Sequence, residues 1–210
     1  MIRCMTAACA ALLLAAPALA GAAEQLPRGL ARLSPDDFAR SVAVADGPLV
    51  PHIVLSTQSG YKGGQSMSGA YADDVHLKAL IDRQSGRVSW QVWHDLINFH
   101  GKGEVAAIDY LAAGAPRSSA PVKVERWQEM CSAGDTTAPC HPYMRVVFEV
   151  PETVVQEMAA AYRAGSREPW RLRFRDGKGR DMAGGVAPAE AVGLLRSVDE
   201  WRARQGRSVL

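Results

Sequence analysis

The clearest pattern in the chain is a strict alternation of apolar and polar positions on both sides of a polar segment at Asp82–Arg87. A period of two is typical of a half-buried β-strand, and Gly86 in the polar segment tolerates the positive φ that tight turns need. The pattern predicts a β-hairpin over Val75–Trp93. A turn of two residues or of four places all its apolar residues on one face, so both registers stay open. These residues are Val75, Leu77, Ala79, Ile81, Val88, Trp90 and Val92.

Shorter apolar stretches elsewhere, bounded by glycine, proline and polar residues, predict further strands. They run over Leu49–Leu55, Val105–Leu111, Val122–Trp127, Tyr143–Val150 and Trp170–Phe174.

Three segments predict helices. Ser34 precedes Pro35, and Asp37 follows Ser34 by three positions, which is the spacing of a capping box at a helix start. A second helix opens at Pro151 and a third at Pro188, and in both the apolar residues recur at helical spacing. Their apolar stripes are Val154, Val155, Met158 and Tyr162, and Leu194, Leu195, Val198 and Trp201.

Strands that follow one another directly favour hairpins over alternating βαβ units. We therefore predict the α+β class and a single domain over residues 24–206. It is a mostly antiparallel, meandering sheet of about five to seven strands, with two C-terminal helices and one short N-terminal helix packed on one face.

Residues 1–20 have the composition of a secretory signal peptide: Arg3, then the apolar run Ala7–Ala16, then the small-residue site Ala18-Leu19-Ala20. We expect cleavage near Ala20 or Ala23 and a periplasmic or secreted product. The apolar run is too short to span a membrane, and no later stretch reaches the roughly 20 residues of a membrane-spanning helix without a charge, so we expect no transmembrane segment in the mature chain.

Cleavage removes Cys4 and Cys9 and leaves Cys131 and Cys140. In an oxidising compartment two cysteines at this spacing are expected to form a disulfide, which would stabilise the fold by about 2.5–3 kcal/mol. The chain has neither a C-x-x-C motif nor a second ligand pair at zinc spacing, and it lacks the glycine motifs of nucleotide sites. We expect no cofactor and no resident metal.

Composition changes this picture little. The chain is 48% hydrophobic and 22% charged, with a formal net charge of +2, which is ordinary for a globular protein. Such a balance gives no support for nucleic-acid binding.

Asp74, His76 and Asp95 are the candidates for catalysis or metal binding, because strand alternation puts Asp74 and His76 on one face. A two-residue turn places Asp95 directly opposite His76, and carboxylates beside a histidine can bind a metal or orient a general base. A four-residue turn instead places Trp93 opposite His76. The alternative to a site is an ordinary exposed polar face.

Two further sets are candidates for ligand binding. Arg171, Arg173 and Arg175 alternate with apolar residues, so their guanidinium groups project from one face, where they grip an anion or simply protect an edge strand. Trp93 and Trp127 lie on the polar side of their strands, beside Lys78, Lys123 and Glu125. They form a recognition patch for a sugar, peptide or protein unless helices cover that face. The glycine-rich segment Ser56–Tyr71 is interpreted as a flexible loop, with a binding loop as the alternative.

These observations favour an exported, non-catalytic binding or accessory module of the cell envelope, whose partner is an envelope ligand or protein. One alternative is an envelope-acting hydrolase or metal-binding enzyme that uses Asp74, His76 and Asp95. The other is a structural subunit of an envelope complex.

Overall fold

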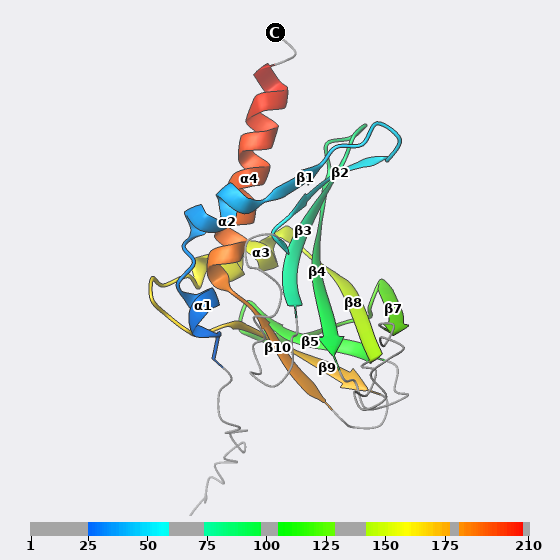
Figure 1. Ribbon diagram of the computed structural model, residues 1–210, viewed down its shortest axis with the longest axis vertical. Helices are drawn as coiled ribbons and strands as arrows, with labels where there is room; N and C mark the ends of the chain where they lie inside the picture. Colours follow the sequence, from blue (N-terminus) through cyan, green and yellow to red (C-terminus); the bar gives the residue numbers. More distant parts are fainter. Residues whose placement is uncertain (1–24, 59–73, 98–104, 129–141, 177–180, 208–210) are drawn as a thin grey trace, which may run out of the picture.

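The computed structural model describes residues 25–58, 74–97, 105–128, 142–176 and 181–207. Within these residues, ten strands form two antiparallel sheets, accompanied by four helices (Figure 1). The predicted α+β class with mostly antiparallel strands and a C-terminal helix is confirmed. The strands, however, are divided between two sheets.

The larger sheet contains, in spatial order, β1 (Ala43–Ala45), β2 (His52–Ser56), β3 (Asp74–Asp82), β4 (Val88–Ile97), β8 (Pro142–Val150) and β7 (Lys123–Gln128). The smaller sheet contains β10 (Met182–Val186), β9 (Trp170–Asp176), β5 (Val105–Ala112) and β6 (Ala115–Ser119). The helices are α1 (Arg28–Ala31), α2 (Pro35–Ser41), α3 (Glu152–Ala160) and α4 (Pro188–Arg207). All the predicted strands and helices are present, whereas α1, β1, β6 and β10 were not predicted.

The turn between β3 and β4 has four residues and fixes the register of the hairpin. Asp82 N–H donates to Arg87 O at 2.9 Å, and Gly86 takes a positive φ of 67°. The Asp82 carboxylate accepts from Ser85 N–H at 2.7 Å and from the Ser85 hydroxyl at 2.7 Å. These bonds from Ser85 lower the pKa of Asp82, so the carboxylate is ionised at neutral pH. The stabilisation of the turn by these hydrogen bonds is lost only when the pH falls below the ordinary pKa range of an aspartate and the carboxylate becomes protonated.

The apolar face of the six-stranded sheet is buried by two different partners. The helices α3 and α4 cover one part of it, and the four-stranded sheet covers the rest, so that one core joins both sheets and both helices. His94 lies at the junction, with its ring 4.6 Å from the ring of Phe174. Gly184 makes this approach close: a Cβ there would lie 3.0 Å from His94 Cε1 and 2.9 Å from Leu172 Cδ1.

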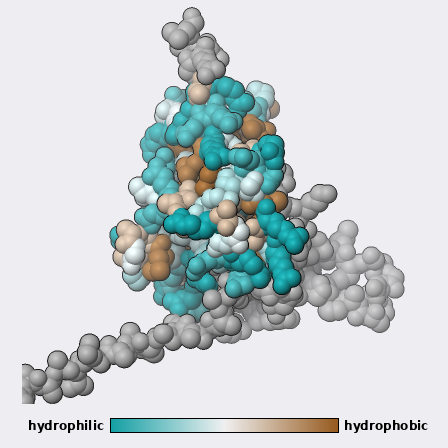
Figure 2. Space-filling view, turned by 90° about the vertical axis from the view of Figure 1, so that its left-hand side faces the viewer, coloured by the Kyte–Doolittle hydropathy of each residue, from teal (hydrophilic) through white to brown (hydrophobic). Residues whose placement is uncertain are grey.

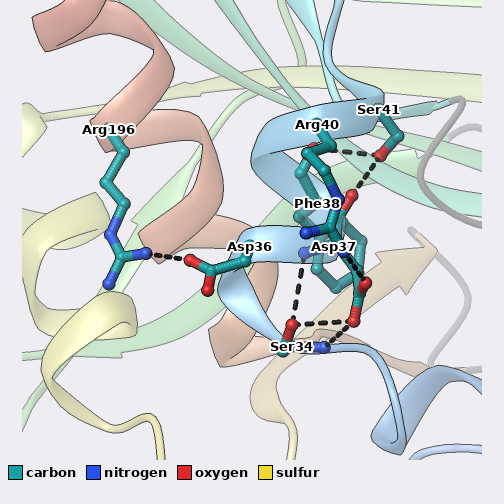
Figure 3. A network of polar contacts seen from close by, with 7 residues as sticks. All are labelled: Ser34, Asp36, Asp37, Phe38, Arg40, Ser41 and Arg196. Carbon is teal, nitrogen blue, oxygen red and sulfur yellow. Dashed lines mark hydrogen bonds and ion pairs between the residues drawn. The ribbon is translucent and has the colours of Figure 1, made fainter.

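The predicted capping box at the start of α2 is present (Figure 3). Ser34 N–H donates to Asp37 Oδ2 at 2.9 Å, and Asp37 N–H donates back to Ser34 Oγ at 3.2 Å. The hydrogen bonds from Ser34 lower the pKa of Asp37. An ion pair between Asp36 and Arg196 then joins α2 to α4.

The helices α2 and α4 approach closely at Gly193. A Cβ at this position would lie 2.6 Å from Phe38 Cβ and 2.9 Å from the carbonyl oxygen of Pro35. The absence of a side chain therefore permits this contact. In the described part of the chain, no helix combines the length and apolar character needed to cross a membrane.

Replacing Gly193 by alanine should lower the free energy of unfolding by about 1–3 kcal/mol, because the added methyl group overlaps the backbone of α2. Helix propensity alone predicts the opposite sign, a gain of about 1 kcal/mol. Urea denaturation followed by circular dichroism measures the difference.

Ala203 is exposed on the same helix and provides the control. Ala203→Gly should cost about 1 kcal/mol through propensity alone. A Gly193→Ala protein as stable as the wild type would contradict the close α2–α4 contact.

Candidate functional site

The hairpin register separates His76 from its predicted partner. His76 lies directly opposite Trp93, and Asp74 lies directly opposite Asp95, so the pairing of His76 with Asp95 that a two-residue turn would give is wrong. The four-residue turn is the physical reason, because it shifts the partner of each residue by two positions.

His76 and Asp95 each have other contacts. The His76 side chain is fully buried, and its ring stacks on the indole of Trp93 with the centroids 5.9 Å apart. Both oxygens of Asp95 accept from Arg145 on β8, at 2.6 and 2.7 Å. Asp74 is described only in its backbone pairing. In the described ranges, no three His, Cys, Asp or Glu side chains are grouped as metal ligands.

The same register gathers a different set of side chains on the polar face of the six-stranded sheet. Strands β3, β4, β8 and β7 lie side by side there, and their alternate residues form one surface around a partly exposed tryptophan. We call this surface the Trp93 patch. It consists of Lys78, Gln91, Trp93, Asp95, Lys123, Glu125, Arg145 and Glu149.

Three cations from three different strands surround the Trp93 indole. The Lys78 ammonium lies 3.5 Å from the ring centroid, the Arg145 guanidinium carbon 5.2 Å, and the Lys123 ammonium 5.8 Å. Cations within about 6 Å are attracted by the ring quadrupole. The indole Nε1–H donates to Gln91 Oε1 at 3.0 Å, and Gln91 Nε2 donates to Glu149 Oε1 at 3.2 Å. The tryptophan is therefore held both by its faces and by its polar edge.

Acidic and basic groups are paired within the patch. Glu125 lies 2.7 Å from Lys123 and 3.6 Å from Arg145, and the hydrogen bond from Lys123 lowers the pKa of Glu125. The three cations balance the carboxylates of Asp95, Glu125 and Glu149. This arrangement offers separate positive and negative groups beside an aromatic ring, without an excess of either sign.

Several predicted residues lie outside the described residues. Cys131 and Cys140 are among them, as are the signal peptide and most of the glycine-rich segment Ser56–Tyr71. The backbone of Trp127 lies in β7 opposite Tyr143, but its side chain is also outside the described part.

The row formed by Arg171, Arg173 and Arg175, called here the arginine row, does not lie on an edge strand. Its strand β9 is flanked by β10 and β5, because the unpredicted strand β10 covers its other side. Asp109 of β5 forms ion pairs with both arginines: its Oδ2 lies 3.3 Å from Arg173 Nη2 and 2.9 Å from Arg175 Nε. Arg173 also pairs with Asp181 at 3.5 Å, and Arg171 lies 3.9 Å from Glu168. Carboxylates of the same chain therefore already neutralise the row.

A pocket lies between α1, the end of α3 and the start of α4. Its free space of about 20 Å³ holds roughly one water molecule. Its lining is mostly apolar and includes Leu26, Leu30, Tyr162 and Ala187. It is too small for an organic ligand.

A buried polar contact that the sequence did not reveal joins α4 to the six-stranded sheet. Glu190 is fully buried, and its Oε1 accepts from the backbone N–H of Leu77 at 2.9 Å and from the Thr57 hydroxyl. The Leu77 N–H also reaches Thr57 Oγ1 at 2.9 Å. Since a glutamate in the first turn of a helix is usual, its position in sequence gave no sign that it is buried.

Comparison with known proteins identifies no relative: no family model matches the chain, and no curated protein or solved structure is significantly similar to it.

Replacing Glu190 by alanine should destabilise the fold by about 1–3 kcal/mol, because the bonds from Leu77 and Thr57 lose their carboxylate acceptor in a site without water access. Urea unfolding measures the change. Glu200 is exposed on the same helix, and Glu200→Ala should stay within about 0.5 kcal/mol of the wild type. Equal effects of the two substitutions would contradict a structural role for Glu190.

Proposed function

We propose that the protein is an exported, non-catalytic binding or accessory module of the cell envelope, and that it binds its ligand through the Trp93 patch. The observation that supports this most directly is the arrangement of Lys78, Arg145 and Lys123 around the partly exposed indole of Trp93. Partly exposed tryptophans flanked by charged groups are enriched where proteins recognise ligands and partners.

The internal contacts of the patch support binding more than catalysis. Asp95 is held by two short bonds from Arg145, so an action as general base or metal ligand would first require breaking that ion pair. His76 is fully buried, and its ring stacks on Trp93. Ligand binding, by contrast, requires neither the Asp95–Arg145 ion pair nor the His76–Trp93 contact to be broken. The hydrolase alternative has lost the His76–Asp95 pair on which it was based.

The balance of charges indicates the class of ligand. A patch with three cations and three carboxylates around an aromatic ring matches a polar ligand that carries both amino and carboxylate groups. Peptide-bearing polysaccharide of the cell wall has this chemistry. We therefore take purified peptidoglycan sacculi as the probe.

Trp93→Ala should weaken co-sedimentation with purified sacculi by about tenfold or more, because truncating a central tryptophan commonly costs more than 1.4 kcal/mol of binding energy. Circular dichroism of the variant checks that the fold is retained.

The matched control is the triple substitution of Arg171, Arg173 and Arg175 by alanine, which removes the other predicted binding surface and should leave sedimentation unchanged. Loss of binding in the triple variant with normal binding by Trp93→Ala would assign the ligand to the arginine row instead. A wild-type protein that does not sediment with sacculi would overturn the ligand class.

Export makes a separate prediction. The protein recovered from the periplasm or medium should begin at Gly21 or Glu24, and Cys131 and Cys140 should resist alkylation until a reductant is added. Intact mass and peptide mapping test both points. A full-length intracellular chain with free thiols would contradict the proposal. Serine at both cysteines should cost about 2.5–3 kcal/mol of stability if the bridge is present.

A further inference from the structure

The strand β1 ends the six-stranded sheet, and its outer edge faces no other strand among the described residues. All three of its residues are exposed. The apolar side chain of Val44 is 50% exposed. The backbone groups along this edge are therefore accessible to a pairing strand.

The register shows which groups point outward. Thr57 N–H donates to Leu77 O of β3 at 3.1 Å, and backbone groups alternate in direction along a strand. Ser56 and Val54 of β2 therefore point toward β1, where they pair with Ala43 and Ala45. It follows that both the N–H and the C=O of Val44 point out of the sheet.

The two edges of this sheet differ in a way that matters for pairing. The opposite edge strand, β7, carries Lys123, Glu125 and Arg126, and charges of this kind hinder the addition of another strand. The sequence of β1 is Ala-Val-Ala, with no charge at all. The β7 edge is therefore protected by its charges, whereas the β1 edge is limited only by its length of three residues.

The loop that follows β1 adds apolar surface in a fixed position. Leu49 is 96% exposed and Val50 46%, at the end of the β1–β2 hairpin, which lies to one side of α4 (Figure 1). Arg83 holds this loop: its Nε donates to Val50 O at 2.9 Å, its Nη2 donates to Gly47 O at 2.8 Å, and it pairs with Asp46. By contrast, the helix-bearing face is mostly hydrophilic and shows only small, separate apolar areas (Figure 2).

We propose that β1 pairs with β1 of a second copy of this chain, antiparallel, about a two-fold axis at Val44. In this register the two Val44 residues exchange both hydrogen bonds, and Ala43 of each copy lies opposite Ala45 of the other. Every residue of β1 is then paired, and the two sheets join into one of twelve strands. Such a contact is isologous, as in most homodimers.

Charge and backbone chemistry favour this register over its neighbour. With the axis at Val44, Asp46 lies opposite the apolar Val42 of the second copy, so this register brings no like charges together. An axis at Asp46 would bring two carboxylates together and would place Pro48, which has no N–H, opposite Val44. The contact is short, so the dimer is weak and depends on concentration.

The two-fold axis of an antiparallel pair is perpendicular to the sheet, so both Trp93 patches lie on the same side of the joined sheet. This consequence, which rests on the proposed function, gives the dimer two binding surfaces for one polymer and hence higher avidity. The dimer itself does not depend on the ligand.

A cysteine at position 44 tests the pairing and the register together. Val44→Cys should form an intermolecular disulfide under mild oxidation, because the facing Cα atoms of a hydrogen-bonded antiparallel pair are about 5.5 Å apart, within the range that a disulfide bridges. Ala43→Cys should not, because its counterpart is displaced by two residues and lies roughly 8 Å away. Non-reducing electrophoresis and peptide mapping identify the bond. No cross-link at 44, or equal cross-linking at 43, would overturn the proposal.

Sedimentation velocity of the mature protein over a range of concentrations provides the second measurement. The wild type should shift toward a dimer as its concentration rises, and Val44→Lys should abolish the shift by placing two ammonium groups at the axis. Val124→Lys, the matched change on β7, should not affect it. Trp93→Ala should also dimerise normally, which separates a failure of this proposal from a failure of the binding function.

A wild-type monomer that instead binds lipid vesicles through Leu49 would assign the hairpin to a membrane and overturn the dimer.

Discussion

The four-residue turn between β3 and β4 is the constraint from which the rest of the six-stranded sheet follows. The Asp82 carboxylate accepts from Ser85, and Gly86 supplies the positive φ, so the register of two long strands is fixed by a few local contacts. That register places Trp93 opposite His76. Because β8 pairs with β4 and β7 pairs with β8, it also determines which charged residues reach the indole. A shift by two residues would disperse the Trp93 patch.

The inner face of the same sheet depends on contacts between residues far apart in the chain. The four-stranded sheet approaches closely enough for His94 to pack on Phe174, because Gly184 leaves room for the ring. Two positions along β3 from the residue that pairs with His94, the backbone N–H of Leu77 donates to Glu190 of α4. The helices and the smaller sheet thus share one apolar surface, and the polar face of the large sheet keeps its own set of contacts.

Local signals in the sequence were sufficient to predict the capping box at Ser34, the hairpin and the main helices, because each depends on neighbouring residues. These signals could not decide between a two-residue and a four-residue turn, since both leave the apolar residues on one face. Division into two sheets depends on the pairing of β5 with β9, which lie far apart in the sequence and show no local sign of it. For the same reason Arg173 was expected at an edge, although β10 covers its strand. The candidate site was predicted in part: Trp93 was named with Lys78 and Lys123, whereas Arg145 was not, because β8 pairs with β4 from a distant part of the chain.

The side chains of the Trp93 patch are held in place by contacts within the protein. Its indole edge is bonded to Gln91, and Arg145 is fixed by Asp95, so little side-chain freedom is left to lose on binding. Loss of such freedom is one of the main costs of association, and a rigid surface avoids it. In the binding role proposed above, such a surface distinguishes ligands by the positions of their charges relative to an aromatic plane, which a balanced set of charges defines better than a uniformly basic one.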